Sequence, residues 1–339
     1  MADLLENVEL RDKNTFRLPA KARYYADYTT LDELRNLLRH PLVAGLPVFI
    51  LGGGSNLVVT KDYDGLVLHP IDQSVQIVRE DKKKVVVRVG AGKNWSEFVS
   101  QMVKKHRTGI ENLSGIPGTV GGAAVQNIGA YGMEVKNAIV SVTCYDPATD
   151  TVIEIMRRDL GYRYRMSYFK TPEGAGLIVL KVTFHLSKVF VPNLKYKALA
   201  ERIRALPKKK ITPADVAEQV LALRKSKLPN VKRLGSAGSF FKNPILSPMH
   251  GQRVLKRDPN IPFHPMSSGR IKIPAAWLIA HGRIRGKRHE QAHIFRKAPL
   301  VIVNSGQARA SDVLAVAYAV REGIRRRYSI ALQFEPVIL

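Results

Sequence analysis

Two glycine-rich segments carry residue types and spacings that could bind a phosphate-containing ligand. The first, Gly52-Gly53-Gly54-Ser55-Asn56, follows an apolar run from Leu46 to Leu51 and predicts a strand that ends in a glycine turn. Backbone N–H groups in such a turn can approach phosphate oxygens closely, because no side chain intervenes. The spacing is neither the dinucleotide fingerprint GxGxxG nor the phosphate loop GxxxxGKS. On its own, the segment is therefore also compatible with a plain tight turn.

The second segment, residues 111–132, reads ENLSGIPGTVGGAAVQNIGAYG and is rich in glycine but poor in charge. A disordered linker would be more polar. An apolar glycine-rich stretch favours backbone folded tightly against something large and flat. The alternative is a glycine-rich turn region of a sheet protein, but that alternative does not explain why Gln126 and Asn127 lie between two glycine runs.

Taken together, GGGSN and IPGTVGGAAVQNIGAYG resemble the UDP-N-acetylenolpyruvoylglucosamine reductases, also called UDP-N-acetylmuramate dehydrogenases. In that family both segments wrap FAD, with the pyrophosphate along the glycine turns and the second segment near the isoalloxazine. The resemblance implies a set of FAD-binding residues in this chain: Gly52, Gly53, Gly54, Ser55, Asn56, Ile116, Pro117, Gly118, Gly121, Gly122, Gln126, Asn127, Gly129, Ala130 and Tyr131.

Further elements of the same family follow in the family's order along nearly the whole chain. Asn14-Thr15-Phe16-Arg17 resembles its N-terminal Asn-Thr element, and residues 161–170 (GYRYRMSYFK) resemble its YRDSxFK segment. Residues 235–244 (GSAGSFFKNP) resemble its signature GNAGSFFKNP, and Glu335-Pro336 resembles its terminal Glu-Pro. Several independent motifs in order leave little room for coincidence.

The resemblance also implies a reaction and three catalytic residues. The family uses NADPH to reduce FAD, and the reduced flavin gives hydride to the enolpyruvyl ether of a UDP-sugar. Arg165 matches the arginine that stabilises the enolate, for which a planar guanidinium is well suited. Ser239 matches the proton donor, and Glu335 matches the carboxyl group near the substrate carboxylate. Without the motifs, Arg165 would be interpreted as a scattered surface arginine, Ser239 as the cap of a helix or strand, and Glu335 as an exposed carboxylate in a strand.

Three residues are implied to bind the substrate. Lys227 matches a family lysine near the UDP diphosphate, and Asn243 matches the asparagine of the FFKNP element. Tyr196 lies where the longer, type I form of the family carries a tyrosine loop over the nucleotide. An ordinary half-buried tyrosine is the alternative for Tyr196.

The match is imperfect at four places. Met166 stands where the family usually has Asp, and this change could loosen Arg165 or indicate a repacked pocket. Ser236 replaces the Asn of GNAGS, and Val337 replaces an acid after the terminal proline. The segment from Ala280 to Pro299 departs most, so no substrate contact is carried over from it.

Composition limits the functional classes further. The chain has 54 Lys and Arg against 28 Asp and Glu, for a net charge of +26. The basic residues are dispersed and not interleaved with aromatics, which favours solvated surface and attraction of anionic ligands over a dedicated nucleic-acid site. The single cysteine, Cys144, makes neither a disulfide nor a zinc cluster and is expected to be packed. No metal is expected.

Targeting signals are also absent from the sequence as it stands. No stretch of about 18 apolar residues predicts a transmembrane helix, and the N-terminal residues lack a signal-peptide core. We therefore expect a cytoplasmic protein without membrane insertion, and a monomer. Two rival functions remain, another flavin oxidoreductase on the same FAD fold and a basic nucleic-acid-binding protein.

Periodicity and capping signals predict the main elements. Thr30 with Glu33 predicts a capped helix, and Thr212 before Pro213 predicts another that runs to about Lys225. Residues 228–270, with several prolines, are expected to be mainly loop, and Ser311 is expected to cap a last helix. Further expected elements are strands at 84–89, 138–145, 151–156, 175–186, 300–303 and 329–339, and helices at 95–106 and 274–280.

The predicted fold class is α+β. The resemblance implies an FAD-binding module of the vanillyl-alcohol-oxidase (PCMH) type with two subdomains, about residues 1–70 and 71–200, which together make a module of residues 1–200. Residues 201–339 are expected to form a C-terminal α+β domain that binds the substrate.

Overall fold

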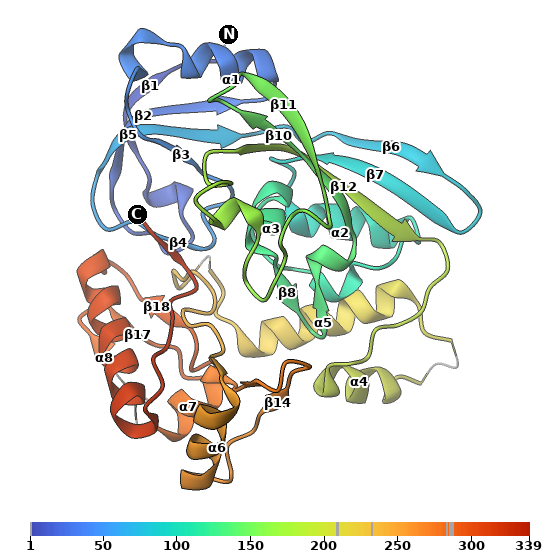
Figure 1. Ribbon diagram of the computed structural model, residues 1–339, viewed down its shortest axis with the longest axis vertical. Helices are drawn as coiled ribbons and strands as arrows, with labels where there is room; N and C mark the ends of the chain where they lie inside the picture. Colours follow the sequence, from blue (N-terminus) through green and yellow to red (C-terminus); the bar gives the residue numbers. More distant parts are fainter. Residues whose placement is uncertain (1, 208–209, 232, 283, 285–287) are drawn as a thin grey trace. The chain divides into compact units, whose positions relative to one another are not determined.

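The computed structural model describes residues 2–207, 210–231, 233–282, 284 and 288–339 (Figure 1). Its helices and strands form a mixed α and β structure, as the sequence predicts. No helix in these ranges is long and apolar enough to cross a membrane. Some of the dispersed basic residues, among them Lys208 and Arg283, lie outside the described residues.

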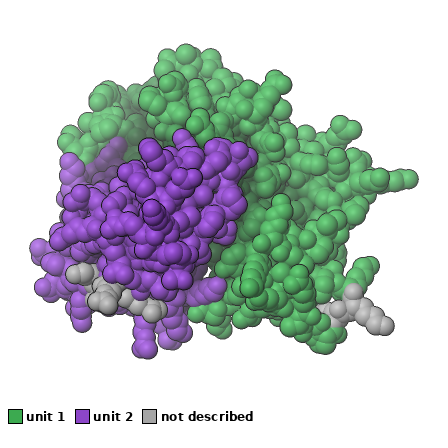
Figure 2. Space-filling model, turned by 60° about the horizontal axis from the view of Figure 1, so that its bottom comes forward, with its two compact units in different colours: residues 1–8, 22–53, 64–226 green, residues 9–21, 54–63, 227–339 purple. Residues whose placement is uncertain are grey.

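The chain divides into two compact units (Figure 2). Unit 1 comprises residues 1–8, 22–53 and 64–226, and unit 2 comprises residues 9–21, 54–63 and 227–339. Two short N-terminal segments thus belong with the C-terminal part of the chain. A linear boundary near residue 200 does not describe these units, and as a boundary between functional domains it stays a prediction.

A five-stranded antiparallel sheet forms the centre of unit 1, with the strand order β11-β10-β12-β7-β6. Helices α2 (Trp95–Lys104) and α3 (Val120–Gln126) lie against one face of it (Figure 1). Alternate valines of β7 are fully buried beneath them, as the period-2 pattern KVVVRV predicts. The strands are β6 (Val75–Glu80), β7 (Lys84–Gly90), β10 (Ile139–Asp146), β11 (Thr151–Met156) and β12 (Ile178–Ser187).

A four-stranded sheet, in the order β1-β2-β5-β3, lies at the start of the chain. Helix α1 (Leu31–Leu38) begins with the predicted capping box, in which the Thr30 side chain accepts from the Glu33 N–H and Glu33 accepts from the Thr30 N–H. Leu34 on this helix is buried in the core it shares with the sheet. The strands are β1 (Leu5–Glu9), β2 (Lys21–Tyr28), β3 (Val48–Ile50) and β5 (Tyr63–Pro70).

Two helices complete unit 1. In α5 (Pro213–Lys227), the Thr212 hydroxyl accepts from the Asp215 N–H at 3.3 Å, and Asp215 accepts from the Thr212 N–H at 2.9 Å. The predicted cap is therefore confirmed. Buried side chains of α5 pack against α4 (Lys197–Arg204), including Leu199.

Unit 2 has its own apolar core, built from three helices and several short strands. Helix α8 (Ala310–Tyr328) packs on the three-stranded sheet β16-β17-β18. The other two helices are α6 (Pro248–Arg257) and α7 (Ala275–His281). Near the end of the chain, β19 pairs in parallel with β4.

Short elements connect the larger ones. Besides β3, the strands of two or three residues in the described chain are β4 (Leu57–Val58), β8 (Gly129–Ala130), β9 (Met133–Glu134), β13 (Ile245–Leu246), β14 (His264–Pro265), β15 (Ile271–Lys272), β16 (Arg288–His289), β17 (Ala292–Ile294), β18 (Ile302–Asn304) and β19 (Val337–Ile338). The 3-10 helices are η1 (Arg11–Lys13), η2 (Pro41–Val43), η3 (Glu111–Leu113), η4 (Val135–Asn137) and η5 (Tyr168–Lys170).

The described part of residues 228–270 is mainly loop, as predicted, but it also contains helix α6, which Ser247 caps and in which Pro248 suits the first helical turn. Two other local predictions were wrong. Helix α8 begins one residue before Ser311, with Arg309 as its N-cap. The last eleven residues form only the two-residue strand β19 and one isolated bridge at Phe334, because residues 333–335 make just two backbone hydrogen bonds to the segment 240–242.

Candidate functional site

The two glycine segments meet in unit 1. A Cβ placed on Gly53 would lie 2.7 Å from the Cα of Gly118, and one on Gly52 would lie 3.0 Å from Oγ1 of Thr119. Such distances leave no room for a side chain at Gly53, since the neighbour is backbone. Gly53 is nevertheless exposed on its other side. The sequence-predicted glycine turn and the second segment are thus brought together by backbone packing.

Helix α3 starts inside the glycine-rich segment. Thr119 caps it by accepting from the Gly122 N–H at 3.3 Å, and Gly121 packs so closely on Ala91 that a Cβ would lie 2.9 Å from it. The backbone at Gly52, Gly118 and Gly122 remains partly exposed. Accessible peptide groups without side chains are what a flat phosphate-bearing cofactor requires, so these residues fit the FAD that the resemblance implies.

The remaining predicted cofactor residues of unit 1 differ in exposure. Ile116 and Ala130 pack in part against the core beneath α2 and α3, whereas Pro117 is exposed. Asn127 is fully buried and ends α3 in a left-handed conformation, with φ of 44°. Its Nδ2 donates to the Arg163 carbonyl at 2.8 Å, so this amide is engaged inside the protein.

Arg165 lies in a tight turn formed by residues 163–166, and the Asn127 side chain donates a hydrogen bond to this turn at the Arg163 carbonyl. Arg163 and Met166 exchange two backbone hydrogen bonds, of 3.1 and 3.0 Å, across the turn. Arg165 has φ of 55°, which is uncommon for a residue with a side chain. Its Nη2 donates to the carbonyl of Gly129 at 3.2 Å. The structure therefore brings the predicted catalytic arginine to the predicted cofactor segment.

Two tyrosines that the sequence predicts for the site also meet. The rings of Tyr131 and Tyr196 are in edge-to-face contact, with centroids 5.2 Å apart. Burial raises the pKa of Tyr131, while the nearby Arg224 opposes that rise. Asn112, fully buried, donates to the carbonyl of Tyr131 at 2.8 Å and to that of Asn193 at 2.9 Å, and so joins the two tyrosine-bearing loops.

In unit 2, the N-terminal Asn-Thr element fastens two other motifs. Thr15 donates its hydroxyl to the Ser236 carbonyl at 2.7 Å, and its N–H donates to the Gly54 carbonyl at 3.1 Å. Gly54 has φ of 59° and lies against the backbone of Lys13, which leaves no space for a side chain. The GGGSN and GSAGS segments are thus both bonded to Thr15, in the turn that follows the 3-10 helix η1.

Ser239 and Glu335, 96 residues apart in the chain, lie on neighbouring extended segments. The N–H of Glu335 donates to the carbonyl of Phe240 at 2.9 Å, and Ser239 bridges to Val301 on its other side. Asn56 donates to the Glu335 carbonyl at 3.2 Å. Ser239, Asn56 and Glu335 are all partly exposed. A predicted proton donor, a carboxyl group and an amide therefore occupy one edge of unit 2.

Two of the predicted substrate residues, Lys227 and Asn243, belong to unit 2. The Oδ1 of Asn243 accepts from the Ala275 N–H at 2.9 Å, so this amide fixes the start of α7. Lys227 is exposed at the last residue of α5.

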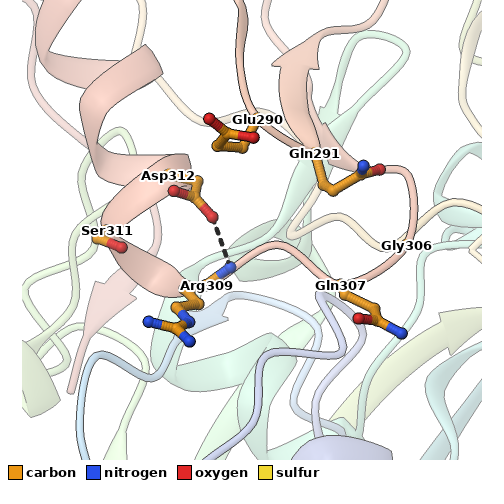
Figure 3. A pocket seen from close by; sticks show the side chains of 7 residues that line it. All are labelled: Glu290, Gln291, Gly306, Gln307, Arg309, Ser311 and Asp312. Carbon is orange, nitrogen blue, oxygen red and sulfur yellow. Dashed lines mark hydrogen bonds between the residues drawn. The ribbon is translucent and has the colours of Figure 1, made fainter.

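A hollow in unit 2 lies elsewhere. It has a volume of about 510 Å³ and surrounds the first turn of α8, where Asp312 accepts from the Arg309 N–H at 2.8 Å (Figure 3). No predicted site residue lines it, and its lining mixes Arg309 with Glu290 and Asp312. Such a shallow polar surface does not offer the glycine backbone or the hydroxyl–carboxyl pair that the sequence indicates.

Comparison with known proteins decides the family. Residues 22–155 match the family model described as FAD binding domain, and residues 229–339 match that of UDP-N-acetylenolpyruvoylglucosamine reductase, C-terminal domain. A UDP-N-acetylenolpyruvoylglucosamine reductase of Burkholderia pseudomallei is 39% identical over 338 residues, 99% of this chain and 97% of that protein. This chain belongs to the UDP-N-acetylenolpyruvoylglucosamine reductase family.

Other comparisons agree. A UDP-N-acetylenolpyruvoylglucosamine reductase of Neisseria gonorrhoeae is also 39% identical over 99% of this chain. The crystal structure of the reductase from Thermus caldophilus aligns with all of this chain and 98% of its own, at 24% identity and a TM-score of 0.69, and so shares its fold. The resemblance read from the motifs is thereby confirmed, as is the fold class with its FAD-binding domain.

Two residues escaped the sequence analysis. Asn112 precedes the glycine-rich core of its segment and carries no recognisable local signal. Lys170 ends the YRYRMSYFK segment, and its position in a family-like motif could have singled it out. Its ammonium group donates to Oε1 of Gln126 and, at 3.4 Å, to the carbonyl of Arg165.

Proposed function

We propose that this chain reduces UDP-N-acetylglucosamine enolpyruvate to UDP-N-acetylmuramate with NADPH, through bound FAD. The backbone hydrogen bond that joins Glu335 to Phe240, the residue after Ser239, is the observation that carries the proposal, since Ser239 and Glu335 both lie in the region matched by the reductase C-terminal model. A full-length identity of 39% to reductases of that name supports the same substrate.

The glycine segments would hold the cofactor. Gly52, Gly53 and Gly118 offer accessible backbone for a pyrophosphate, and Gly129 lies beside Arg165, where the reacting ring would be near. Bound at these residues, FAD would supply hydride transfer between NADPH and the methylene carbon of the enolpyruvyl group. Gln126 and Tyr131 belong to the same stretch and complete the proposed set in unit 1.

Arg165 would bind the substrate carboxylate and the enolate that forms when hydride adds. The planar guanidinium can donate two parallel N–H bonds to the two oxygens of the substrate carboxylate. These bonds strengthen as negative charge moves into the carboxylate during hydride addition. Binding that is stronger in the transition state than in the ground state accelerates the chemical step. The Gly129 carbonyl already orients one side of the guanidinium.

Ser239 would then donate its hydroxyl proton to the carbon next to the carboxylate. One C–H bond forms there, one O–H bond breaks, and the resulting alkoxide recovers a proton from solvent. Glu335 would hydrogen-bond the enolate from the neighbouring segment when it is protonated. The backbone hydrogen bond between Glu335 and Phe240 joins the two chain segments that carry Ser239 and Glu335.

Substrate binding would involve Tyr196, Lys227 and Asn243. The exposed ammonium of Lys227 suits a diphosphate. Tyr196 is partly buried against Tyr131, which corresponds to a tyrosine loop folded onto the protein. The net charge of +26 would attract both anionic substrates over long range. We further propose that the enzyme acts as a cytoplasmic monomer in peptidoglycan precursor synthesis.

A visible absorbance spectrum of the purified protein tests the proposal. We expect a flavin spectrum that bleaches with NADPH under anaerobic conditions and returns when UDP-N-acetylglucosamine enolpyruvate is added. A flavin that bleaches but does not return would favour another flavin oxidoreductase on this fold. A protein that takes up no FAD would contradict the proposal and favour a basic nucleic-acid-binding protein. Steeply salt-dependent binding of nucleic acid would test that alternative.

A further inference from the structure

The turn that carries Arg165 is strained and needs support from its surroundings. Arg165 has a left-handed backbone, with φ of 55°, although it bears a long side chain. Such a conformation persists only when neighbouring interactions over-determine it, and strain of this kind clusters at functional sites. The turn contains no glycine that would make the conformation easy. Something outside the turn must therefore fix it.

The last residues of α3 supply that support at three consecutive positions. The carbonyl of Val125, a helix-end acceptor, receives a hydrogen bond of 2.6 Å from the Ser167 hydroxyl. Oε1 of Gln126 accepts from the Lys170 ammonium, and Asn127 donates to the Arg163 carbonyl at 2.8 Å. Residues before and after Arg165 in the sequence are thus hydrogen-bonded to the C-terminal end of α3.

Lys170 differs from Ser167 and Asn127 because its side chain bonds to Arg165 itself. Its Nζ donates to the Arg165 carbonyl at 3.4 Å as well as to Gln126. A positive charge at the C-terminal end of α3 is also favoured by the helix dipole. Because the donated bond ends on the carbonyl of the left-handed residue, it fixes ψ and hence the direction in which the side chain leaves the turn.

We propose that Lys170 is a positioning residue, which holds Arg165 so that its guanidinium lies on the Gly129 carbonyl and faces the reacting group. The proposal rests on the role given to Arg165 above. Lys170 itself neither touches the substrate nor transfers a proton. Its contribution is to keep one conformation of the turn populated, so that the guanidinium does not have to be ordered in each catalytic cycle.

Holoenzyme variants separate this role from general structural support. Lys170→Met keeps the length and volume of the side chain but removes its donors, and Lys170→Arg restores donors and charge. In Lys170→Met we expect flavin reoxidation by the enolpyruvyl UDP-sugar to slow by about 10- to 100-fold, as displaced catalytic groups do. Reduction by NADPH should remain within about 2-fold of the unmodified enzyme, because that step does not use Arg165. Lys170→Arg should recover most of the lost rate.

A double-mutant cycle makes the test specific. If Lys170 acts through Arg165, adding Lys170→Met to Arg165→Met should slow reoxidation no further than Arg165→Met alone. Full multiplication of the two effects would overturn the proposal, and so would an unchanged reoxidation rate in Lys170→Met. Equal slowing of both half-reactions would also overturn it, because that result indicates general damage to the fold.

A crystal structure of Lys170→Met decides the same point without turnover. We expect Arg165 to leave the left-handed region or to lose its contact with Gly129. Retention of both features would overturn the positioning role. If the unmodified enzyme were reduced by NADPH but never reoxidised by the UDP-sugar, the proposed function would fail, and the crystal structure would still decide whether Lys170 holds the turn.

Discussion

Gly53 and Gly118 lie so close that a Cβ on the first would be 2.7 Å from the Cα of the second. This contact joins two segments that are 65 residues apart in the chain. It also leaves their backbones bare on the side where the proposed FAD pyrophosphate would lie. Loss of this contact should therefore affect stability and cofactor content together.

Gly53→Ala is expected to destabilise the protein by about 2 kcal/mol, because the added methyl group meets backbone that cannot move aside without cost. FAD content after purification should fall with it. Thermal unfolding and the flavin-to-protein absorbance ratio measure the two effects. Gly176→Ala is the matched control, since a Cβ there meets nothing within 4 Å. Unaltered melting and flavin content in Gly53→Ala would contradict the proposed cradle.

Ser239→Ala is expected to leave flavin reduction by NADPH nearly normal. Reoxidation by the enolpyruvyl substrate should slow by roughly 10²- to 10⁴-fold, the usual contribution of a positioned proton donor. Anaerobic stopped-flow absorbance resolves the two half-reactions. Ser311→Ala removes an exposed hydroxyl at the start of α8 and serves as control. Reoxidation at the normal rate in Ser239→Ala would remove this serine from the mechanism.

Asn112→Ala should loosen the contact between the loops that carry Tyr131 and Tyr196. The Asn112 side chain donates a hydrogen bond to a carbonyl in each loop, and both bonds would be lost. We expect a destabilisation of about 2 kcal/mol, since two partly buried carbonyls lose their donor. KM for the UDP-sugar should rise more than kcat falls if Tyr196 covers the nucleotide. Denaturant unfolding and steady-state kinetics measure these effects, with Asn260→Ala, at an exposed position, as control. A change in kcat alone would argue against a loop that binds the nucleotide.

Cys144 should be unreactive toward thiol reagents at pH 8 in the native protein. It is fully buried, and burial raises the pKa of its thiol from 9.0 to about 12. Because the raised value favours the neutral thiol in the folded state, the associated stability is present below pH 9 and is lost as the pH rises from 9 to 12. One thiol should label in denaturant and none within minutes in buffer; rapid labelling of the native protein would contradict the buried position.

Structural features that depend only on residues close together in the sequence were predictable. The cap of α1 at Thr30, the cap of α5 at Thr212 and the alternating valines of β7 all depend on neighbours at most four positions away. The family motifs, being contiguous, were equally visible, and the comparisons confirmed the family that they indicate. Even the missed helix α6 had its local signal in Ser247-Pro248, which the surrounding prolines obscured.

The sequence alone therefore determined the family, the fold class and the list of residues to consider. Only the tertiary structure decided how those residues are arranged: that the Asn127 side chain donates to the Arg163 carbonyl, that Lys170 donates to Gln126, and that Ser239 and Glu335 lie on neighbouring segments. The physical reason is the range of the interactions. Capping and alternation are encoded by adjacent residues, whereas these contacts join segments up to 96 residues apart, whose pairing depends on packing across the whole unit.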